Sequence, residues 1–162
     1  ALPIFFTLQI FSLSRKRGAN VGLVFAERKV MEPKNKCTAK KLPLIYSCSG
    51  CSSAAQLANY LAVKADRKKL AEMSCIAGVG GDVPALVRVA KSGRPMIAID
   101  GCPLQCVKSC LKKQGVTPTL HFILSDYNIK KTFHEDFSEE DAARLVEEIE
   151  SALKKLNQDQ KE

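Results

Sequence analysis

The residues in this chain best suited to chemistry are its cysteines, six of which fall in three short clusters. Cys48 and Cys51 are separated by two residues in a turn that contains glycine, and Cys75 stands in the second cluster. Cys102 and Cys106 open the third cluster. Cysteine thiolates bind zinc and iron–sulfur clusters, and the spacing of the first pair also occurs in thiol–disulfide enzymes. The clusters therefore indicate a metal site or a redox site.

Each cluster lies where a predicted strand gives way to a predicted helix. Short apolar runs indicate buried strands at 42–46, 73–79, 96–99 and 120–124, with helical patterns between them. This alternation is typical of a parallel sheet. We expect an α/β fold, a single three-layer αβα domain with a four-stranded, mostly parallel sheet and helices on both faces. Because ligands bind at the carboxyl ends of such strands, the thiols should converge at one edge.

Cys102 is the thiol for which the sequence indicates the clearest activation. Pro103 suits the first position of a helix, so Cys102 is expected to occupy the N-cap, where the helix dipole lowers the pKa of a thiol. Cys106 then lies one helical turn further on. Cys110 would lie about 12 Å from Cys102 along the axis, whereas two thiolates on one zinc are roughly 4 Å apart. We therefore expect Cys110 to lie outside the site.

Three polar residues near the expected site have roles that the sequence leaves open. Asp100 ends the third strand, where it either orients a ligand or hydrogen-bonds the turn. His121 falls within an apolar strand and is expected in the core. His134 belongs to the polar linker 125–137, from which it could reach the site.

The charge of the chain argues against nucleic acid as a partner. Of the formal net charge of +8, residues 1–40 carry +6, from 8 basic and 2 acidic residues, and residues 41–162 carry only +2. A nucleic-acid-binding domain should carry a basic patch on its folded surface, and this chain has no Trp for stacking on bases.

Residues 1–40 are expected to be a poorly ordered leader or an upstream extension, with the folded domain at 41–160. The apolar run 1–13 is shorter than the roughly 20 residues that span a bilayer, so no stable membrane span is expected. Basic residues follow this run, whereas a secretory signal has them before it. Met31 is a candidate for the natural start; a membrane anchor or a truncated targeting peptide is the alternative. Without a secretory signal, an odd number of cysteines favours a reducing, cytoplasmic location.

Three ordered motifs resemble one known family. They read CSGCS at 48–52, MSCIAGV at 73–79 and IDGCPLQC at 99–106. Together they resemble the DGC-domain proteins, small and mostly prokaryotic proteins described as zinc-binding and named for an Asp-Gly-Cys motif. The resemblance covers about residues 42–131 and names no reaction. It implies zinc ligation by Cys48, Cys51, Cys75, Cys102 and Cys106.

The sequence therefore predicts a small cysteine-ligated zinc-binding protein, with the metal held by strand-end loops and with a role in metal handling or homeostasis. Five candidate thiols exceed the four ligands of a closed structural zinc, which indicates a spare thiol or a site that transfers metal. An iron–sulfur cluster is the alternative cofactor. A thiol-redox or thiolate-nucleophile enzyme using Cys102 or Cys51 is the alternative function. A third interpretation is an interaction module whose metal only holds loops together; no particular protein partner is indicated.

Overall fold

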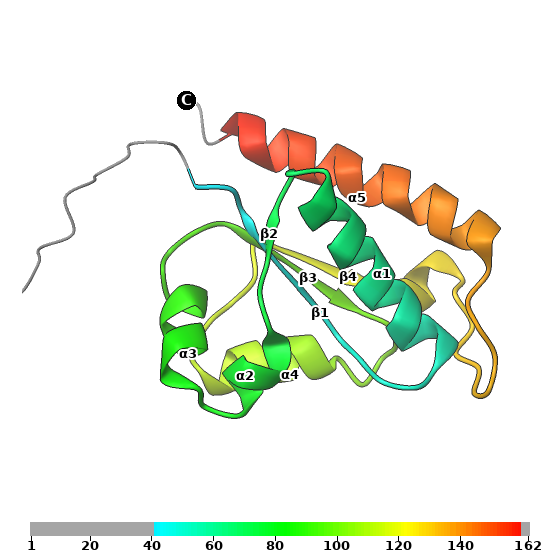
Figure 1. Cartoon of the computed structure of the whole chain (residues 1–162), viewed down its shortest axis with the longest axis horizontal. Coiled ribbons are helices and arrows are strands. Elements are labelled where there is room, and N and C mark those ends of the chain that lie inside the picture. Colours follow the sequence, from blue (N-terminus) through cyan, green and yellow to red (C-terminus); the bar gives the residue numbers. More distant parts are fainter. Residues whose placement is uncertain (1–40, 160–162) are drawn as a thin grey trace, which may run out of the picture. The chain divides into compact units, whose positions relative to one another are not determined.

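The computed structural model describes residues 41–159, and its centre is a four-stranded sheet (Figure 1). The strands are β1 (Leu44–Ser47), β2 (Glu72–Met73), β3 (Met96–Asp100) and β4 (Leu120–Ile123), arranged in the order β2-β1-β3-β4. All neighbouring strands run parallel. The expected α/β fold with a parallel sheet is therefore confirmed.

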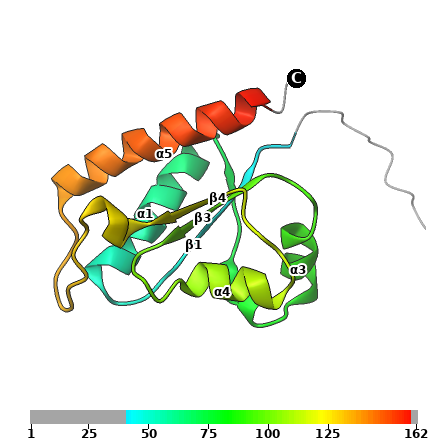
Figure 2. The same ribbon diagram turned by 180° about the vertical axis from the view of Figure 1, so that it is seen from behind.

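Helices cover both faces of the sheet (Figures 1 and 2). On one face, α1 (Ser53–Arg67) packs against α5 (Glu139–Asp159). On the other, α2 (Ile76–Gly80) packs against α3 (Pro84–Ala90) and α4 (Cys106–Lys113). A short 3-10 helix, η1 (Leu124–Tyr127), follows β4 directly. The three layers are those expected from the alternation of strands and helices.

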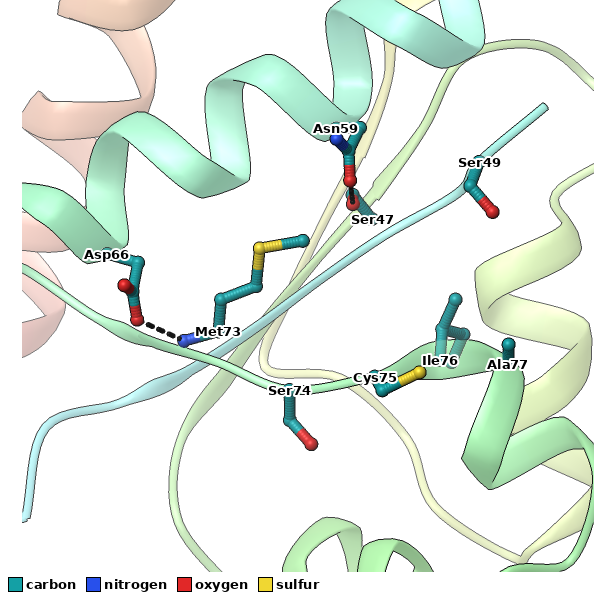
Figure 3. A pocket seen from close by; sticks show the side chains of 9 residues that line it. All are labelled: Ser47, Ser49, Asn59, Asp66, Met73, Ser74, Cys75, Ile76 and Ala77. Atoms are coloured by element: carbon teal, nitrogen blue, oxygen red, sulfur yellow. Dashed lines mark hydrogen bonds between the residues drawn. The ribbon is translucent and has the colours of Figure 1, made fainter. Parts of the chain in front are cut away.

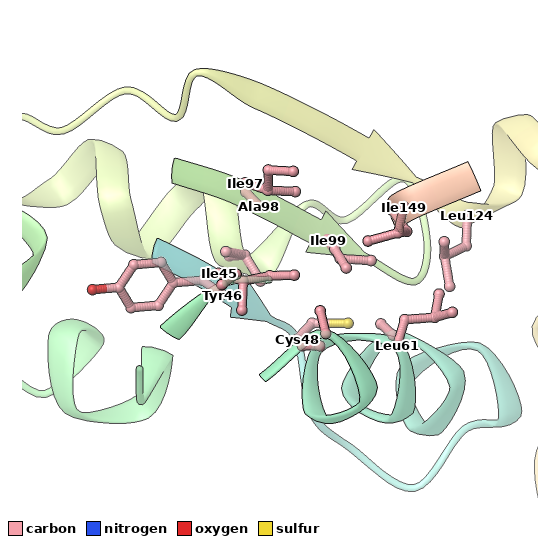
Figure 4. Close-up of a cluster of buried hydrophobic side chains, with 14 of the residues drawn as sticks. Ile45, Tyr46, Cys48, Leu61, Ile97, Ala98, Ile99, Leu124 and Ile149 are labelled. Atoms are coloured by element: carbon pink, nitrogen blue, oxygen red, sulfur yellow. The ribbon is translucent and has the colours of Figure 1, made fainter. Parts of the chain in front are cut away.

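The core forms because the two central strands are buried along their whole length. Ile45 and Ile99 are fully buried in the sheet, and Leu61 of α1 and Ile149 of α5 close over it (Figure 4). Burying one such side chain stabilises a fold by about 1.5–3 kcal/mol. The core therefore rests on apolar packing.

Two helices begin at serine residues whose hydroxyl groups cap the first turn. The hydroxyl of Ser52 accepts a hydrogen bond from the Ala55 amide (3.4 Å) at the start of α1. The hydroxyl of Ser138 accepts one from the Asp141 amide (3.3 Å) at the start of α5. Each side chain satisfies a backbone donor that the first turn of a helix leaves free.

The second strand is much shorter than expected, and most of the segment 73–79 is helical. Short apolar runs do not distinguish strands from buried helices. Helix α2 packs closely because it contains glycines: a Cβ added at Gly78 would lie 2.0 Å from Cδ1 of Leu86, and one added at Gly80 would lie 2.8 Å from Sγ of Cys110. Gly78 and Gly80 are therefore positions of close helix packing.

The expectations for residues 1–40, including Met31 as a start, lie outside the described residues. Within residues 41–159, no helix is long and apolar enough to cross a membrane. The expected domain boundary at residue 41 stays a prediction.

Candidate thiol site

The order of the strands explains how the cysteine clusters meet. From β1 the chain passes to β2 on one side, and it then returns to β3 on the other side of β1. This change of direction makes a topological switch point between β1 and β3, the usual place for a ligand in an open parallel sheet. The loops that follow these two strands carry Cys48, Cys51 and Cys102, and Cys106 begins α4 directly afterwards. Sequence reasoning predicted the edge of the sheet but not this pairing of loops.

A direct contact joins the two loops. The amide of Gly101 donates a hydrogen bond to Sγ of Cys48 (3.1 Å), and the amide of Cys48 donates one to the carbonyl of Ile99 (3.0 Å). A Cβ at Gly101 would lie 2.6 Å from the carbonyl oxygen of Ala54, which is part of the rigid first turn of α1. Only glycine therefore fits where the Asp-Gly-Cys turn passes α1.

Cys48 is the most protected thiol of the group, with 7% of its surface exposed. Burial raises the pKa of the Cys48 thiol to about 11, and the nearby charges of Asp100, Cys106 and Cys102 add to the rise. The Gly101 amide acts in the opposite direction, because it donates to the sulfur. Cys102 and Cys106 thus lie close enough for their negative charge to disfavour ionisation of Cys48.

Asp100 supports the turn that carries Cys102. Its carboxylate is 1% exposed and accepts hydrogen bonds from the amides of Val107 (2.8 Å) and Lys108 (3.2 Å), in the first turn of α4. Its other contact is with Nε2 of His121, at 2.9 Å. Of the two roles left open for Asp100, the structure supports hydrogen bonding within the turn. His121 is only partly in the core and pairs with this carboxylate.

The prediction that Cys102 caps the helix is wrong. Residues 101–105 form a turn in which the amide of Gln105 donates to the carbonyl of Cys102 (3.2 Å), and Gln105 takes a left-handed conformation (φ 50°). Helix α4 begins only at Cys106, and its first turn is capped by the Asp100 carboxylate, which accepts a hydrogen bond from the Val107 amide. The helix-rise argument for the position of Cys110 therefore loses its basis. Cys110 lies on α4 beside Gly80, with its pKa raised by burial and then by the charge of Cys106.

Lys131 is a site residue that sequence reasoning missed. Its Nζ lies 3.9 Å from Sγ of Cys102. The segment that carries it is held to the start of α1, because the amide of Thr132 donates to the Ser53 hydroxyl and the amide of Ser53 donates to the Thr132 carbonyl, both at 3.0 Å. In the sequence, the adjacent lysines at 130 and 131 in the polar linker were the feature that could have indicated a positive charge near the thiols. His134, the linker residue considered instead, is exposed.

Cys75 and Cys51 are both exposed. Cys75 precedes α2 and lines a cavity of about 390 Å³ at the carboxyl ends of β1 and β2 (Figure 3). Ser49, from the loop that also contains Cys51, forms part of the same cavity wall. The second cluster therefore lies next to the first, although no contact between their sulfurs is present.

The thiols supply the donor chemistry that zinc uses, but they do not form a preformed ligand shell. Among residues 41–159, no three His, Cys, Asp or Glu side chains are arranged as a group that could hold a metal ion. The five predicted ligands share one edge of the sheet. Their sulfur donors suit a thiophilic metal, but their arrangement does not form a metal site. A metal there would require side chains or loops to close around it.

The fold and the site define a class: a small α/β domain with free thiols at the switch point of a parallel sheet. The family model of the DGC domain matches residues 44–149, and the chain belongs to this family. The chain is also 62% identical over 112 residues to the anaerobic and virulence modulator AnvM of Pseudomonas aeruginosa, a match that covers 69% of this chain and 86% of that protein. No solved structure matches the chain.

Proposed function

We propose that this protein binds zinc through cysteines of the loops that follow β1, β2 and β3. The observation that carries the proposal is the contact between Gly101 and Cys48, which joins the two loops richest in thiols. The candidate ligands are five cysteines, four in these loops and one at the first residue of α4: Cys48, Cys51, Cys75, Cys102 and Cys106. When bound, zinc would favour their thiolate forms and hold the loops together.

The residues around the thiols prepare them for a cation. The Gly101 amide donates to Cys48 and favours its thiolate, and the Lys131 ammonium lies beside the sulfur of Cys102. Burial of Cys48 and repulsion from negative charge on Cys102 and Cys106 act against the ionisation of Cys48. A divalent cation would relieve this repulsion, which is the physical reason for expecting binding there.

We further propose a regulatory role in metal handling, in the cytoplasm. AnvM is named as a modulator, and this chain shares most of its length with it. The six cysteines of the described residues are free thiols, which suits a reducing compartment.

Metal content of protein purified without an affinity tag tests the proposal. We expect one tightly held zinc per chain, with most thiols protected from a thiol reagent until a chelator is added. Cys48→Ser and Cys102→Ser should each lower the zinc content, whereas Cys110→Ser, the matched control on α4, should retain it. Metal-free protein with reactive thiols throughout would contradict the proposal. Visible absorbance of anaerobically prepared protein would reveal an iron–sulfur cluster instead.

The second candidate function is thiol–disulfide exchange, which the position of Lys131 beside Cys102 favours. The Cys102 thiolate would attack one sulfur of a substrate disulfide, and that disulfide bond would break with release of one substrate thiolate. Cys106 would then displace the second substrate thiolate, leaving an internal disulfide and a substrate reduced by two electrons.

Alkylation kinetics separate this function from the first. Metal-free protein should then contain one fast thiol, at Cys102. Its alkylation should be slowed by Lys131→Met but not by Lys130→Met, the same change at the neighbouring exposed lysine. Equal rates for both variants would argue against exchange at Cys102.

A further inference from the structure

A second surface of the molecule, separate from the thiols, lies where β4 meets α5. A groove of about 520 Å³ runs between them, with Leu120 and Phe122 of β4 on one wall and Ser151, Ala152 and Lys155 of α5 on the other. It lies on the face of the sheet that α5 covers. The proposed zinc function does not use it.

The wall formed by β4 is an edge strand of the sheet with apolar surface beside it. Among the described residues, β4 pairs with β3 only, so its other edge is open. Leu120 is 36% exposed, although the side chain is large and apolar. An open edge beside apolar surface is a common place for another chain to associate.

The wall formed by α5 carries two opposite charges without partners of their own. Glu148 and Lys155 line the groove, and neither forms an ion pair within residues 41–159. They are two turns apart, about 10 Å along the axis, so they cannot pair with each other. The small residues Ser151 and Ala152 lie between them and permit close approach of another helix.

We propose that a second copy of this chain covers the groove, in a symmetric dimer in which α5 lies antiparallel to α5 of the partner. Glu148 and Lys155 are equally far along the helix from the midpoint between Ser151 and Ala152. A two-fold axis at that midpoint places Glu148 opposite the partner's Lys155, and the same pair recurs on the other side of the axis. Any acidic or basic partner would satisfy one charge, but self-complementary spacing is what a second copy requires.

Sedimentation of the full chain under reducing conditions, over a concentration series, tests the dimer. Glu148→Lys places two lysines opposite each other at both pairs, and Lys155→Glu places two glutamates there. Each single variant should raise the dimer dissociation constant about tenfold, since two exposed pairs change from attraction to repulsion. The double variant should restore it to within about threefold, because the charges are exchanged and complementary again.

Mixing the two single variants provides the sharpest result. One chain then has lysine at both positions and the other has glutamate at both, so the mixed dimer should form in preference to either homodimer. Glu147→Lys makes the same charge change at an exposed position of α5 that does not line the groove, and it should change association much less than Glu148→Lys. A monomeric wild-type protein, or a double variant as weak as the single variants, would overturn the proposal.

Discussion

The amide of Gly101 lies 3.1 Å from the sulfur of Cys48 and donates a hydrogen bond to it, joining the end of β3 to the end of β1. This bond unites two motifs that are distant in sequence. The motif at the end of β3 requires glycine at position 101, because the turn passes so close to the backbone of Ala54 that no Cβ fits. The Asp-Gly-Cys motif is thus a packing requirement as well as a source of thiols.

Gly101→Ala should destabilise the fold and disturb Cys48. The added methyl group would overlap the backbone at the start of α1, which cannot move as a side chain would, and overpacking of this kind costs about 1–3 kcal/mol. Urea unfolding measures the loss, and faster alkylation of Cys48 reports the opened loop. Gly93→Ala is the control, because it has open space but a left-handed backbone (φ 75°), so it should cost about 1 kcal/mol without changing the thiol. Wild-type stability of Gly101→Ala would refute the packing argument.

Asp100→Asn should loosen the start of α4. The carboxylate accepts hydrogen bonds from the backbone amides of Val107 and Lys108. The side-chain amide of asparagine would place its NH2 group against one of these backbone N–H groups, and that hydrogen bond would be lost. Loss of a buried, charge-assisted bond costs about 1–3 kcal/mol. We expect faster hydrogen exchange at the Val107 and Lys108 amides, read by NMR. Asp126→Asn, at an exposed position, should leave those amides unchanged, and equal protection in both variants would show that Asp100 does not cap the helix.

Asp82 should make the attachment of α4 to the α2–α3 turn dependent on pH. Hydrogen bonds from Lys113 and then Gln114 hold the pKa of the Asp82 carboxyl below its usual value. The folded pKa is thus below the unfolded one, so the stabilisation is present above the unfolded pKa and is lost as the pH falls through the folded pKa. Asp82→Asn, which also tolerates the left-handed backbone (φ 59°), should be less stable than wild type at neutral pH. Unfolding curves of the two proteins should converge in acid; a constant difference would contradict this origin.

The sequence was sufficient for most of the fold because its two central strands are mostly apolar and buried, and its helix caps are local. Ser52 and Ser138 cap the helices they precede, and the central strands are buried throughout. The error at residues 73–79 has a physical cause: glycines that suit a loop also suit close packing of two helices, and only the position of Leu86 against Gly78 distinguishes these alternatives.

The site was predictable in composition but not in geometry. Strand-end placement brings the thiols to one edge, but the pairing of β1 with β3 depends on strand order, which local patterns do not encode. The start of α4 was misjudged because Pro103 suits a turn as well as a helix, and the capping carboxylate comes from Asp100, before the turn. Lys131 reaches Cys102 only through the bonds of Thr132 to Ser53, contacts that no spacing in the sequence indicates.

Removal of the proposed zinc should loosen three loops without unfolding the domain. The core between β1, β3, α1 and α5 is apolar, and of its buried residues only Cys48 and Val79 belong to the thiol loops, so secondary structure should survive a chelator or Cys102→Ser. Hydrogen exchange should increase at 47–53, 74–82 and 100–106 and stay unchanged elsewhere, including in α5. Loss of protection throughout the domain would mean that the metal supports the whole fold, as in zinc fingers. No change in the three loops would mean that no metal was bound between them.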